Sequence, residues 1–413
     1  MKKINIILST NFYPIEGGIQ TYMYQLAEHW QKGETIVLCD QEKDEPLSMD
    51  EPFRIERVSK GMVSYPKAIY SIFRTLCSFP SITRLKFLAI LFVNRSFVCR
   101  YSRRISCFLE LVSNNYKQID LIQCSTTIPN AAIGLFAKLL YKIPVITYVH
   151  GSELLILHKK RTTRMLQRFV LRNSDFVIAN SAYTYSLLAS YHLENDKTMI
   201  VNLGADLSKF YPMKPDPSIR KSMGVSQNAF VLLTISHLVS RKGHDMVIRA
   251  LPKIVKSHPE TVYVIAGQGP NEENLRKLVK ELGVENNVHF TGFLQESQLN
   301  SFMNACDLFV MPNRDEDGDI EGFGIVFIEA NACRKPVIAG RSGGAVDAVI
   351  HGKTGYLVDP LDEDKIASSV VSLIENPELR KNMGDQGFLR STEEFNWAAV
   401  THRIYSRIES VIH

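Results

Sequence analysis

Paired cysteines, long apolar runs and a nucleotide-cofactor fingerprint are all missing from this 413-residue chain. Its seven cysteines are scattered, odd in number and never spaced as C-x-x-C, which argues for a reducing compartment and against a disulfide framework or a zinc site. The longest strongly apolar run, FLAILFV at 87–93, has seven residues. A membrane-spanning helix needs about 20. The opening MKKINIILS leads directly into NFYPIEGG, so it resembles a strand and its loop more than a secretory signal. We therefore expect a cytoplasmic protein with no transmembrane segment.

Acidic residues are almost absent between Arg54 and Arg104. This stretch holds eleven Lys or Arg and one acid, Glu56, so it carries +10 in a chain whose net charge is +5. Its basic residues alternate with apolar ones. That pattern suits a surface that binds anionic lipid, and it equally suits a solvated helical face beside an ordinary core. No nucleic-acid recognition motif accompanies the charge, so nucleic acid is not an expected partner.

A second basic cluster follows at 159–172, comprising Lys159, Lys160, Arg161, Arg164, Arg168 and Arg172. Together with residues 54–104 it would suit a phospholipid headgroup or a lipid-diphosphate-linked glycan. The two clusters predict contact with an anionic membrane surface, which would make the protein peripheral at the inner membrane face.

Short β-branched apolar runs alternate with helical patterns through most of the chain. In the first half they lie at 4–9, 35–39, 120–124, 144–149, 175–179 and 198–202, and in the second at 230–236, 261–267, 287–292, 307–312 and 336–340. Runs that are apolar throughout suit parallel strands covered on both faces, and strand–helix alternation predicts doubly wound sheets. Prolines at 212, 215 and 217 interrupt the series and indicate a linker. We predict two Rossmann-like domains joined near residue 210.

Glycine-bearing loops recur where an expected strand passes into a helix. They are Gly17-Gly18, GQGP at 267–270, Gly322-Phe323-Gly324 and Ser342-Gly343-Gly344. Backbone N–H groups exposed at a helix N-terminus favour an anion such as phosphate, although a glycine there is often only a turn. GQGP lacks the third glycine of a dinucleotide fingerprint and the ribose-binding acid that follows it, which argues against NAD.

Eight short segments appear in one order that is typical of a known family. They are FYPIEGGIQ, HGSE at 150–153, NLGADLSKFYP, RKGHD at 241–245, VIAGQGP, VHFTGF, EGFGIVFIEA and GKTGYLVDP, spanning residues 12–360. Together they resemble the retaining glycosyltransferases of family 4, which have the GT-B fold. The resemblance implies an α/β protein with two parallel-sheet domains facing across a cleft. The acceptor-binding domain would cover 1–208 and the nucleotide-sugar-binding domain 209–394, with a final helix at 395–413 that can pack back on the first.

The stretch EGFGIVFIEA carries the family's pair of glutamates, Glu321 and Glu329. The resemblance implies that Glu321 contacts the donor sugar and that Glu329 contacts the ribose hydroxyls. Backbone N–H groups of Phe323, Gly324 and Ile325 would face the sugar and diphosphate, which agrees with the physics of a helix N-terminus. The alternative is an ordinary helix with two solvated glutamates.

Further residues take roles from the same resemblance. Lys242 matches the lysine that neutralises the leaving diphosphate, and the alternative is an exposed loop lysine. His150 matches a residue lining the donor-sugar pocket, although a lone histidine at a strand end is more often structural. Other donor contacts are assigned to Gly17, Gly18, His237, Arg241, Gly267, Gly269 and Phe293.

His237 departs from the family pattern. Where the family has an arginine, this chain has Ser236-His237-Leu238. Histidine lacks the permanently charged guanidinium fork, so either His237 contacts the diphosphate less strongly or Arg241 reaches in instead.

The acidic run RDEDGD at 314–319 offers oxygens of the kind that Mg²⁺ prefers. We favour a solvated loop, because the resemblance implies chemistry with neither a metal nor another cofactor. The paired glutamates are likewise not the two carboxylates of a glycosidase.

The expected function is transfer of a hexose, with UDP-glucose as the favoured donor type, to a glycan or lipid-linked acceptor in exopolysaccharide, capsule or glycolipid synthesis. The alternatives are a GT-B sugar-nucleotide epimerase and a catalytically silent partner subunit that binds sugar nucleotides.

Overall fold

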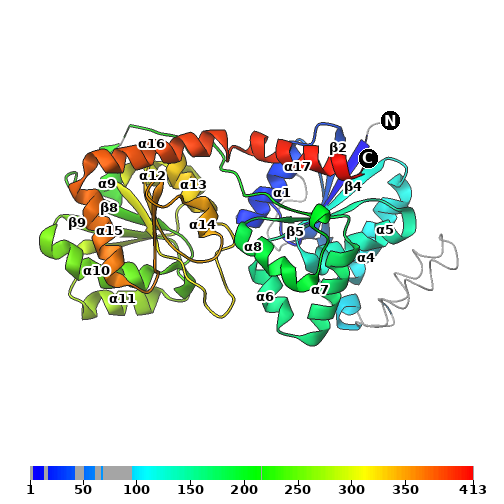
Figure 1. The fold of residues 1–413 in the computed structure, drawn as a ribbon, viewed down its shortest axis with the longest axis horizontal. Helices are drawn as coiled ribbons and strands as arrows, with labels where there is room; N and C mark the ends of the chain where they lie inside the picture. The colour runs from blue at the N-terminus through cyan, green and yellow to red at the C-terminus, as the bar shows by residue number, and fades with distance from the viewer. Residues whose placement is uncertain are drawn as a thin grey trace. The chain divides into compact units, whose positions relative to one another are not determined.

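The computed structural model describes residues 3–13, 17–41, 51–60, 67, 95–214 and 216–412. The chain forms two compact units. Unit 1 comprises Met1–Ala179, Tyr185–Val201 and Thr401–His413, and unit 2 comprises Asn180–Thr184 and Asn202–Val400. Each unit is built on one parallel β-sheet with helices on both faces (Figure 1).

Unit 1 contains a seven-stranded sheet. Its strands are β1 (Lys3–Leu8), β2 (Gly33–Gln41), β3 (Arg54–Ser59), β4 (Ile119–Cys124), β5 (Val145–Val149), β6 (Phe176–Ala179) and β7 (Thr198–Ile200). They lie in the order β3-β2-β1-β4-β5-β6-β7, and every neighbouring pair is parallel. Strand order therefore reverses between β1 and β4, as in a Rossmann fold.

Unit 2 repeats this topology with six strands. They are β8 (Phe230–Ile235), β9 (Thr261–Ala266), β10 (Val288–Gly292), β11 (Leu308–Met311), β12 (Val337–Gly340) and β13 (Gly355–Val358). Their order is β10-β9-β8-β11-β12-β13, again entirely parallel. The corresponding reversal lies between β8 and β11, which makes the carboxyl ends of these two strands the expected ligand-binding position.

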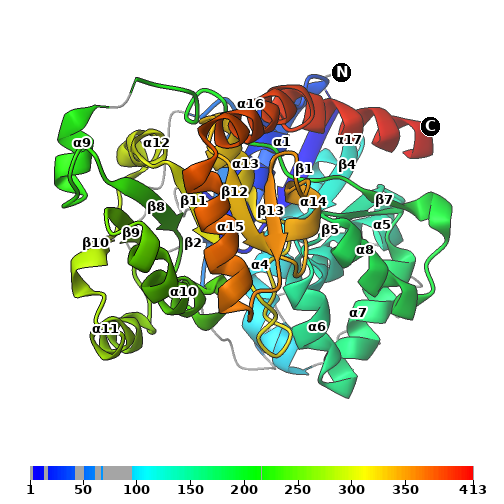
Figure 2. The same cartoon turned by 60° about the vertical axis from the view of Figure 1, so that its left-hand side comes forward.

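The helices in the described part of unit 1 are α1 (Gly18–Glu28), α4 (Arg95–Asn115), α5 (Ala132–Tyr141), α6 (Ser152–His158), α7 (Arg161–Asn173) and α8 (Ala182–Leu187), the last of which begins in unit 2. Short helical turns lie at Thr127–Ala131, Leu188–Tyr191 and Asn195–Lys197. Figure 2 shows α6 and α7 side by side at one end of the unit, and the two helices are in contact.

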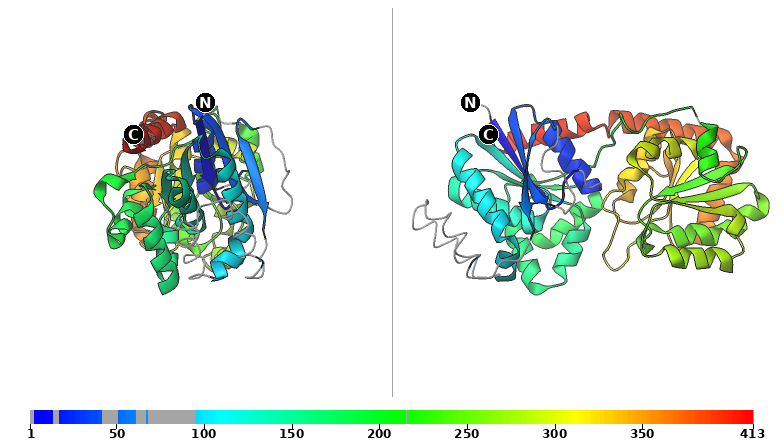
Figure 3. Two further views of the ribbon diagram at one scale, coloured as in Figure 1. Left: turned by 90° about the vertical axis from the view of Figure 1, so that its right-hand side faces the viewer. Right: turned by 180° about the vertical axis from the view of Figure 1, so that it is seen from behind.

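The helices of unit 2 are α9 (Pro217–Ser222), α10 (His244–Ser257), α11 (Glu272–Glu281), α12 (Glu296–Ala305), α13 (Ile325–Ala332), α14 (Ala345–Ala348), α15 (Glu363–Glu375) and α16 (Pro377–Glu393). Helical turns lie at Ser240–Lys242 and Glu285–Asn287. The final helix, α17 (Trp397–Ile412), begins in unit 2 and continues in unit 1, where the Tyr405 hydroxyl donates to the Leu26 carbonyl at 2.5 Å. Figure 3 shows the helices around each sheet from two further sides.

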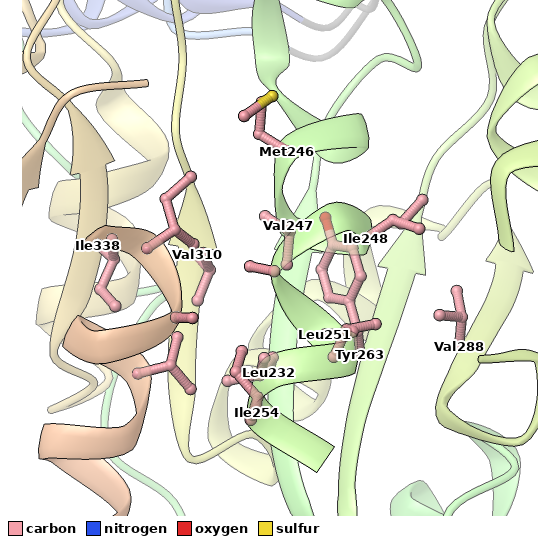
Figure 4. Packing of buried hydrophobic residues seen from close by; sticks show 14 of the residues in the cluster. Leu232, Met246, Val247, Ile248, Leu251, Ile254, Tyr263, Val288, Val310 and Ile338 are labelled. Atoms are coloured by element: carbon pink, nitrogen blue, oxygen red, sulfur yellow. The ribbon is translucent and has the colours of Figure 1, made fainter. Parts of the chain in front are cut away.

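Apolar side chains from both faces of the unit 2 sheet explain its continuous hydrophobic runs. All six residues of β9 are buried, as are five of the six in β8. Val247, Leu251 and Ile254 of α10 pack against Leu232 and its neighbours (Figure 4). A strand covered on both faces has no polar side to alternate with, which is why these strands were recognisable as unbroken runs.

The eleven strands expected from the sequence are all present, but β3 and β13 were missed. β3 is an edge strand whose residues are partly or fully exposed, so its sequence RIERVS has no continuous apolar run. β13 lies at the edge of the other sheet and has only four residues. Edge strands need less apolar cover, and the periodicity that reveals central strands is therefore weak in them.

Candidate active site

The candidate site of unit 2 lies in the two loops that follow β8 and β11. The first loop holds residues 236–243 and the second holds residues 312–324. Because strand order reverses between β8 and β11, their carboxyl ends meet where an open α/β sheet binds its ligand.

Glu321 and two cations come together in these loops. The Glu321 Oε2 atom accepts hydrogen bonds from Lys242 Nζ at 2.5 Å and from Arg241 Nη1 at 2.8 Å. The side chains of Lys242 and Glu321 are only 11% and 14% exposed. Burial alone would raise the pKa of the Glu321 carboxyl, but the charges and hydrogen bonds of Lys242 and Arg241 outweigh it and lower the pKa. Residues 80 positions apart in the chain thus form one ionised cluster, which we call the Glu321 clamp.

A glycine and an ion pair fix the cationic side of the clamp. Gly243 has φ +74°, and a Cβ at this position would lie 2.1 Å from the Pro312 carbonyl oxygen. The backbone N–H of Arg314 donates to the Arg241 carbonyl at 2.8 Å, and its guanidinium pairs with Asp245 at 2.9 Å. The turn that carries both cations is therefore held directly against the loop after β11.

The start of α13 is built on close backbone contacts. Gly324 has φ +86°, and a Cβ there would lie 2.6 Å from the Phe327 ring. Phe323 is buried and packs on Phe395 with ring centroids 5.7 Å apart, so only its backbone can face a ligand. The Gly344 N–H donates to the Glu321 carbonyl at 2.8 Å, which braces the loop from behind. Ile325 is the first residue of α13 and contributes one of the N–H groups left without an intrahelical partner.

Glu329, on the same helix, differs from Glu321 because no hydrogen bond or ion pair is found for its carboxyl group within the described residues. It is half-buried. Burial, reinforced by the nearby charge of Asp206, raises its pKa to about 7, while Lys209 acts in the opposite direction. A partly sheltered carboxyl without a partner is costly once it ionises, so this position favours a polar ligand that can donate hydrogen bonds to it.

His237 is exposed, and one of its ring nitrogens is occupied. The Nδ1 atom lies 2.6 Å from the carbonyl oxygen of Gln268, so the nitrogen donates this bond. Gly267 and Gly269 flank Gln268, and Cβ atoms there would lie 2.0 Å from the Ser236 carbonyl oxygen and 2.5 Å from the Leu238 carbonyl oxygen. The two glycines therefore permit the loop after β9 to cross the loop after β8 at backbone distance.

Phe293 occupies a different surface of unit 2. It follows β10 with 56% of its side chain exposed and lines a hollow that also includes Met223, His289 and Phe302. None of the residues lining that hollow belongs to the Glu321 clamp.

Unit 1 holds the other residues expected at the site. His150 follows β5, is buried and donates from Nε2 to the Ser125 carbonyl oxygen at 2.8 Å. Burial lowers its pKa to about 4, which keeps the ring neutral with its proton on Nε2 and a lone pair on Nδ1. Gly17 is exposed and immediately precedes α1, and Gly18 is the first residue of that helix.

Glu153 is a hydrogen-bond partner of His150 that the sequence did not single out. Its Oε1 atom accepts from the His150 backbone N–H at 2.7 Å, and burial raises its pKa to about 7. Its position three residues after a strand-ending histidine, in the first turn of α6, was the available signal. The partners Asp245, Arg314 and Asp319 were also missed, because ion pairs across loops have no local sequence pattern.

The acidic run at 314–319 supports the clamp in this structure. Asp319 pairs with Arg241 Nε at 3.2 Å, Glu316 pairs with Arg314 at 2.5 Å, and Asp315 accepts from the Gly318 N–H at 2.7 Å. Three of its oxygens are therefore already engaged within the protein.

Most of the basic stretch at 54–104 falls outside the described residues, since positions 61–66 and 68–94 are not among them. Within the described part, Arg104 is buried and pairs with Asp40 at 3.1 Å, which makes it a core residue. Arg57 likewise donates to the Tyr13 carbonyl oxygen at 2.5 Å. At least two of the eleven cations thus have structural contacts.

Family models match both halves of the chain. Residues 16–209 match Glycosyltransferase Family 4, and residues 215–390 match Glycosyl transferases group 1. A GDP-mannose-dependent alpha-(1-6)-phosphatidylinositol monomannoside mannosyltransferase from Mycolicibacterium smegmatis is 34% identical over 287 residues, which are 68% of this chain and 73% of that protein. The chain belongs to the family 4 glycosyltransferases.

Further comparisons agree with this membership. A GDP-mannose-dependent monoacylated alpha-(1-6)-phosphatidylinositol monomannoside mannosyltransferase from Corynebacterium glutamicum is 31% identical over 301 residues, 71% of this chain and 77% of that protein. A crystal structure of Anabaena HepE in complex with UDP and glucose matches with a TM-score of 0.77 at 21% identity, covering 99% of this chain and 100% of that one. The family and the GT-B fold expected from the sequence are confirmed.

This glycosyltransferase shows no helix, within the parts of the chain that the structure describes, that is both long and apolar enough to cross a bilayer.

Proposed function

We propose that this protein is a retaining, metal-independent glycosyltransferase that moves a hexose from a nucleotide diphosphate sugar to a glycan or lipid-linked acceptor. The observation that carries the proposal is the Glu321 clamp, in which two cations and a carboxylate meet at the carboxyl end of β8 and next to the start of α13. An anionic diphosphate is a natural ligand for that arrangement, because it can take over the hydrogen bonds that Lys242 and Arg241 now donate to Glu321.

These contacts support the following roles in the reaction. Negative charge develops on the leaving diphosphate as the bond from the sugar C1 to its phosphate oxygen breaks. Lys242, Arg241 and the N–H groups at the start of α13 are fixed before that moment, so they stabilise the transition state more than the bound donor. The acceptor oxygen forms its bond to C1 on the face that the diphosphate leaves, and its proton passes to the departing phosphate oxygen.

The two glutamates then have different tasks. Glu321, freed from part of its ion pairing, accepts hydrogen bonds from the sugar. Glu329 accepts from the ribose hydroxyls, which would supply donors that its carboxyl group does not have among the described residues. His150 stays neutral and offers the Nδ1 lone pair as an acceptor to the sugar. The loop at Gly17 and Gly18 would contribute backbone donors to the same ligand.

For the donor, the relatives favour a different nucleotide from the one expected. UDP-glucose was the sequence-based expectation, whereas both relatives described above are named as GDP-mannose-dependent. We therefore propose GDP-mannose ahead of UDP-glucose. The relatives' phosphatidylinositol-type acceptors support a glycolipid acceptor and an anionic membrane surface as a partner, with the protein peripheral at the inner membrane face.

The deciding experiment combines binding with turnover. A thermal-shift panel of GDP-mannose, UDP-glucose, UDP-N-acetylglucosamine, GDP and UDP should show one base preferred, because ligand that binds only the folded state raises apparent stability. The preferred donor should then be hydrolysed slowly without acceptor, at a rate unchanged by EDTA. Glu321→Ala and Lys242→Ala should each abolish that hydrolysis.

Other results would separate the alternatives. Donor binding without any turnover, with or without a glycolipid acceptor, supports a silent partner subunit. Formation of a different sugar without acceptor supports an epimerase. Inhibition by EDTA that Mg²⁺ reverses would refute the metal-independent mechanism.

A further inference from the structure

One surface of unit 1 is strongly basic and partly apolar at once. It consists of Arg161, Arg164, Met165, Arg168 and Phe169 on α7, all of which are exposed. We call this set the α7 basic face. Figure 2 shows α7 beside α6 at the lower end of unit 1.

The arginines of the α7 basic face have no ion-pair partner within the described part of the chain. No ion pair or hydrogen bond of the Arg161, Arg164 or Arg168 side chain is found among the residues that the structure describes. Nor does the sequence supply a local partner, since the segment 154–172 contains six Lys or Arg and no Asp or Glu. By contrast, Arg172 donates from Nε to the Tyr191 carbonyl oxygen at 3.1 Å. Three neighbouring cations that lack counter-charges among the described residues repel one another, so an anionic partner would be bound favourably.

Helix geometry directs these side chains outward. At 100° per residue, positions 161, 164, 165 and 168 fall within about 100° of the helix circumference. The rest of the helix is anchored, because Gln167, Val170 and Leu171 are buried. Gln167 also donates to the Thr127 hydroxyl at 3.2 Å, which fixes the rotation of α7 on the unit.

A hollow of about 250 Å³ lies next to these arginines. Its lining comprises His158, Arg161, Arg164, Met165, Arg168, Ser190 and Tyr191. The Tyr191 hydroxyl donates to Gln167 Oε1 at 2.5 Å, and its ring meets the His158 ring edge-on at 5.9 Å. Buried groups therefore hold part of the wall in place, and three arginines contribute to the rest of the lining.

Apolar side chains are interleaved with the cations. Met165 is 64% exposed, Phe169 is 41% exposed, and Ile156 on the adjacent α6 is 52% exposed. Single exposed apolar residues are ordinary, but three of them among unpaired arginines on adjacent helices are typical of a surface that enters the headgroup region of a bilayer.

We propose that the α7 basic face docks on a bilayer that contains anionic phospholipid. Arg161, Arg164 and Arg168 bind headgroup phosphates, and one of these phosphates lies in the hollow beside Tyr191. Met165 and Phe169 enter the boundary between the headgroups and the acyl chains. A soluble polyanion would satisfy the arginines but not the apolar residues. This inference deepens the proposed function, on which it rests for its biological sense, by naming the surface that brings the enzyme to a lipid-linked acceptor. Its test uses no glycosyl transfer, so either idea can fail without the other.

The experiment is flotation of the full chain with phosphatidylcholine vesicles, with and without phosphatidylglycerol. The test variant is Arg161→Gln/Arg164→Gln/Arg168→Gln. Its matched control is Lys221→Gln/Lys256→Gln/Lys280→Gln, which removes the same charge from exposed positions of unit 2. At low salt the wild type and the control should float with anionic vesicles only. The arginine variant should bind roughly a hundredfold more weakly, since each basic residue near such a surface contributes about a fivefold effect.

A second variant separates the bilayer from a soluble polyanion. Met165→Gln/Phe169→Gln keeps the charge and should weaken vesicle binding several-fold, most clearly in high salt, where the arginines are screened. Thermal unfolding of each variant checks that the fold is intact. The proposal is wrong if the arginine variant floats like its control, or if both triple variants lose binding equally. It is also wrong if Met165→Gln/Phe169→Gln has no effect while inorganic tripolyphosphate displaces the protein, which would indicate a soluble polyanion.

Discussion

Lys242 provides the sharpest test of the site, because its charge is needed in two different ways. In the resting protein it pairs with Glu321 at 2.5 Å, and in the reaction it would neutralise the leaving diphosphate. Lys242→Met removes the charge and keeps most of the side-chain volume. A hydrogen bond to a charged group contributes about 1.5–3 kcal/mol, and Arg241 remains to pair with Glu321, so we expect unit 2 to lose stability near the lower end, about 1.5–2 kcal/mol.

This loss should depend on pH with a defined sign. The cations lower the pKa of Glu321, so its ionisation stabilises the folded state above the usual carboxyl range, and that contribution disappears as pH falls through the lowered pKa. The difference between Lys242→Met and the wild type should therefore be largest near neutral pH and shrink in strong acid.

The catalytic loss should be much larger than the stability loss. Removing one preorganised donor to developing negative charge typically costs 10²–10³ in kcat, about 3–4 kcal/mol. The assay is donor hydrolysis without acceptor at saturating donor, with the Kd of the nucleotide diphosphate measured by calorimetry. We expect kcat to fall at least a hundredfold while Kd rises less than tenfold, because a transition-state contact mainly affects kcat.

Lys253→Met is the matched control, since Lys253 is also an ion-paired lysine of unit 2 but bonds Glu363 and Asp364 on the surface. It should leave kcat unchanged. If Lys242→Met retained kcat within threefold of the wild type, or lost only nucleotide affinity, the assignment of Lys242 to the leaving group would be refuted.

Three further predictions concern the same unit. Burial and Asp206 raise the pKa of Glu329 to about 7 from 4.5, so ionised Glu329 opposes folding above pH 7 and not below pH 4.5. Glu329→Gln should therefore stabilise the ligand-free protein at pH 8 by up to about 3 kcal/mol and have little effect at pH 4. It should also weaken nucleotide binding. Equal stabilisation at both pH values in denaturant titrations would contradict the argument. Gly243→Ala places a Cβ 2.1 Å from a carbonyl oxygen at φ +74°, so we expect a loss of folding stability above about 2 kcal/mol and impaired donor hydrolysis. The control Gly283→Ala is also at positive φ, but its Cβ would have nothing within 4 Å, so it should cost only about 1–2 kcal/mol of stability. His237→Arg should tighten diphosphate binding several-fold in calorimetry, because a guanidinium adds a permanent charge and further donors, and an unchanged or weaker Kd would show that position 237 does not face the phosphates.

The sequence predicted the central strands and the identity of the clamp residues for different reasons. Strands such as β8 and β9 are buried on both sides, so nearly all of their residues are apolar and the strands can be recognised from composition. Lys242 and Glu321 were selected only because the segments that contain them, RKGHD and EGFGIVFIEA, resemble motifs of the family 4 glycosyltransferases. Nothing in the spacing of 79 residues between them shows that Nζ and Oε2 lie within hydrogen-bonding distance.

What the sequence could not predict is how loops brace one another. The contact of Gly243 with Pro312, and that of Gly344 with the Glu321 carbonyl, join segments that are distant in the chain. The same limit applies to charge. Arg104 looked like one more cation of a lipid-binding stretch, yet it is buried beside Asp40, whereas Arg164 and Arg168 are exposed and without an ion-pair partner in the described parts of the chain.

The backbone crossings around the clamp also constrain how this enzyme can change its substrate during evolution. At positions 243, 267, 269 and 344 a single added carbon would lie 1.9–2.5 Å from a carbonyl oxygen of another loop. Insertions or larger residues in any one of these loops would displace its neighbours as well, so the loops must vary together or not at all. New donor preferences should therefore arise at outward-facing side chains such as His237. A library that randomises such positions and leaves the glycines intact should yield far more folded variants than one that varies loop length.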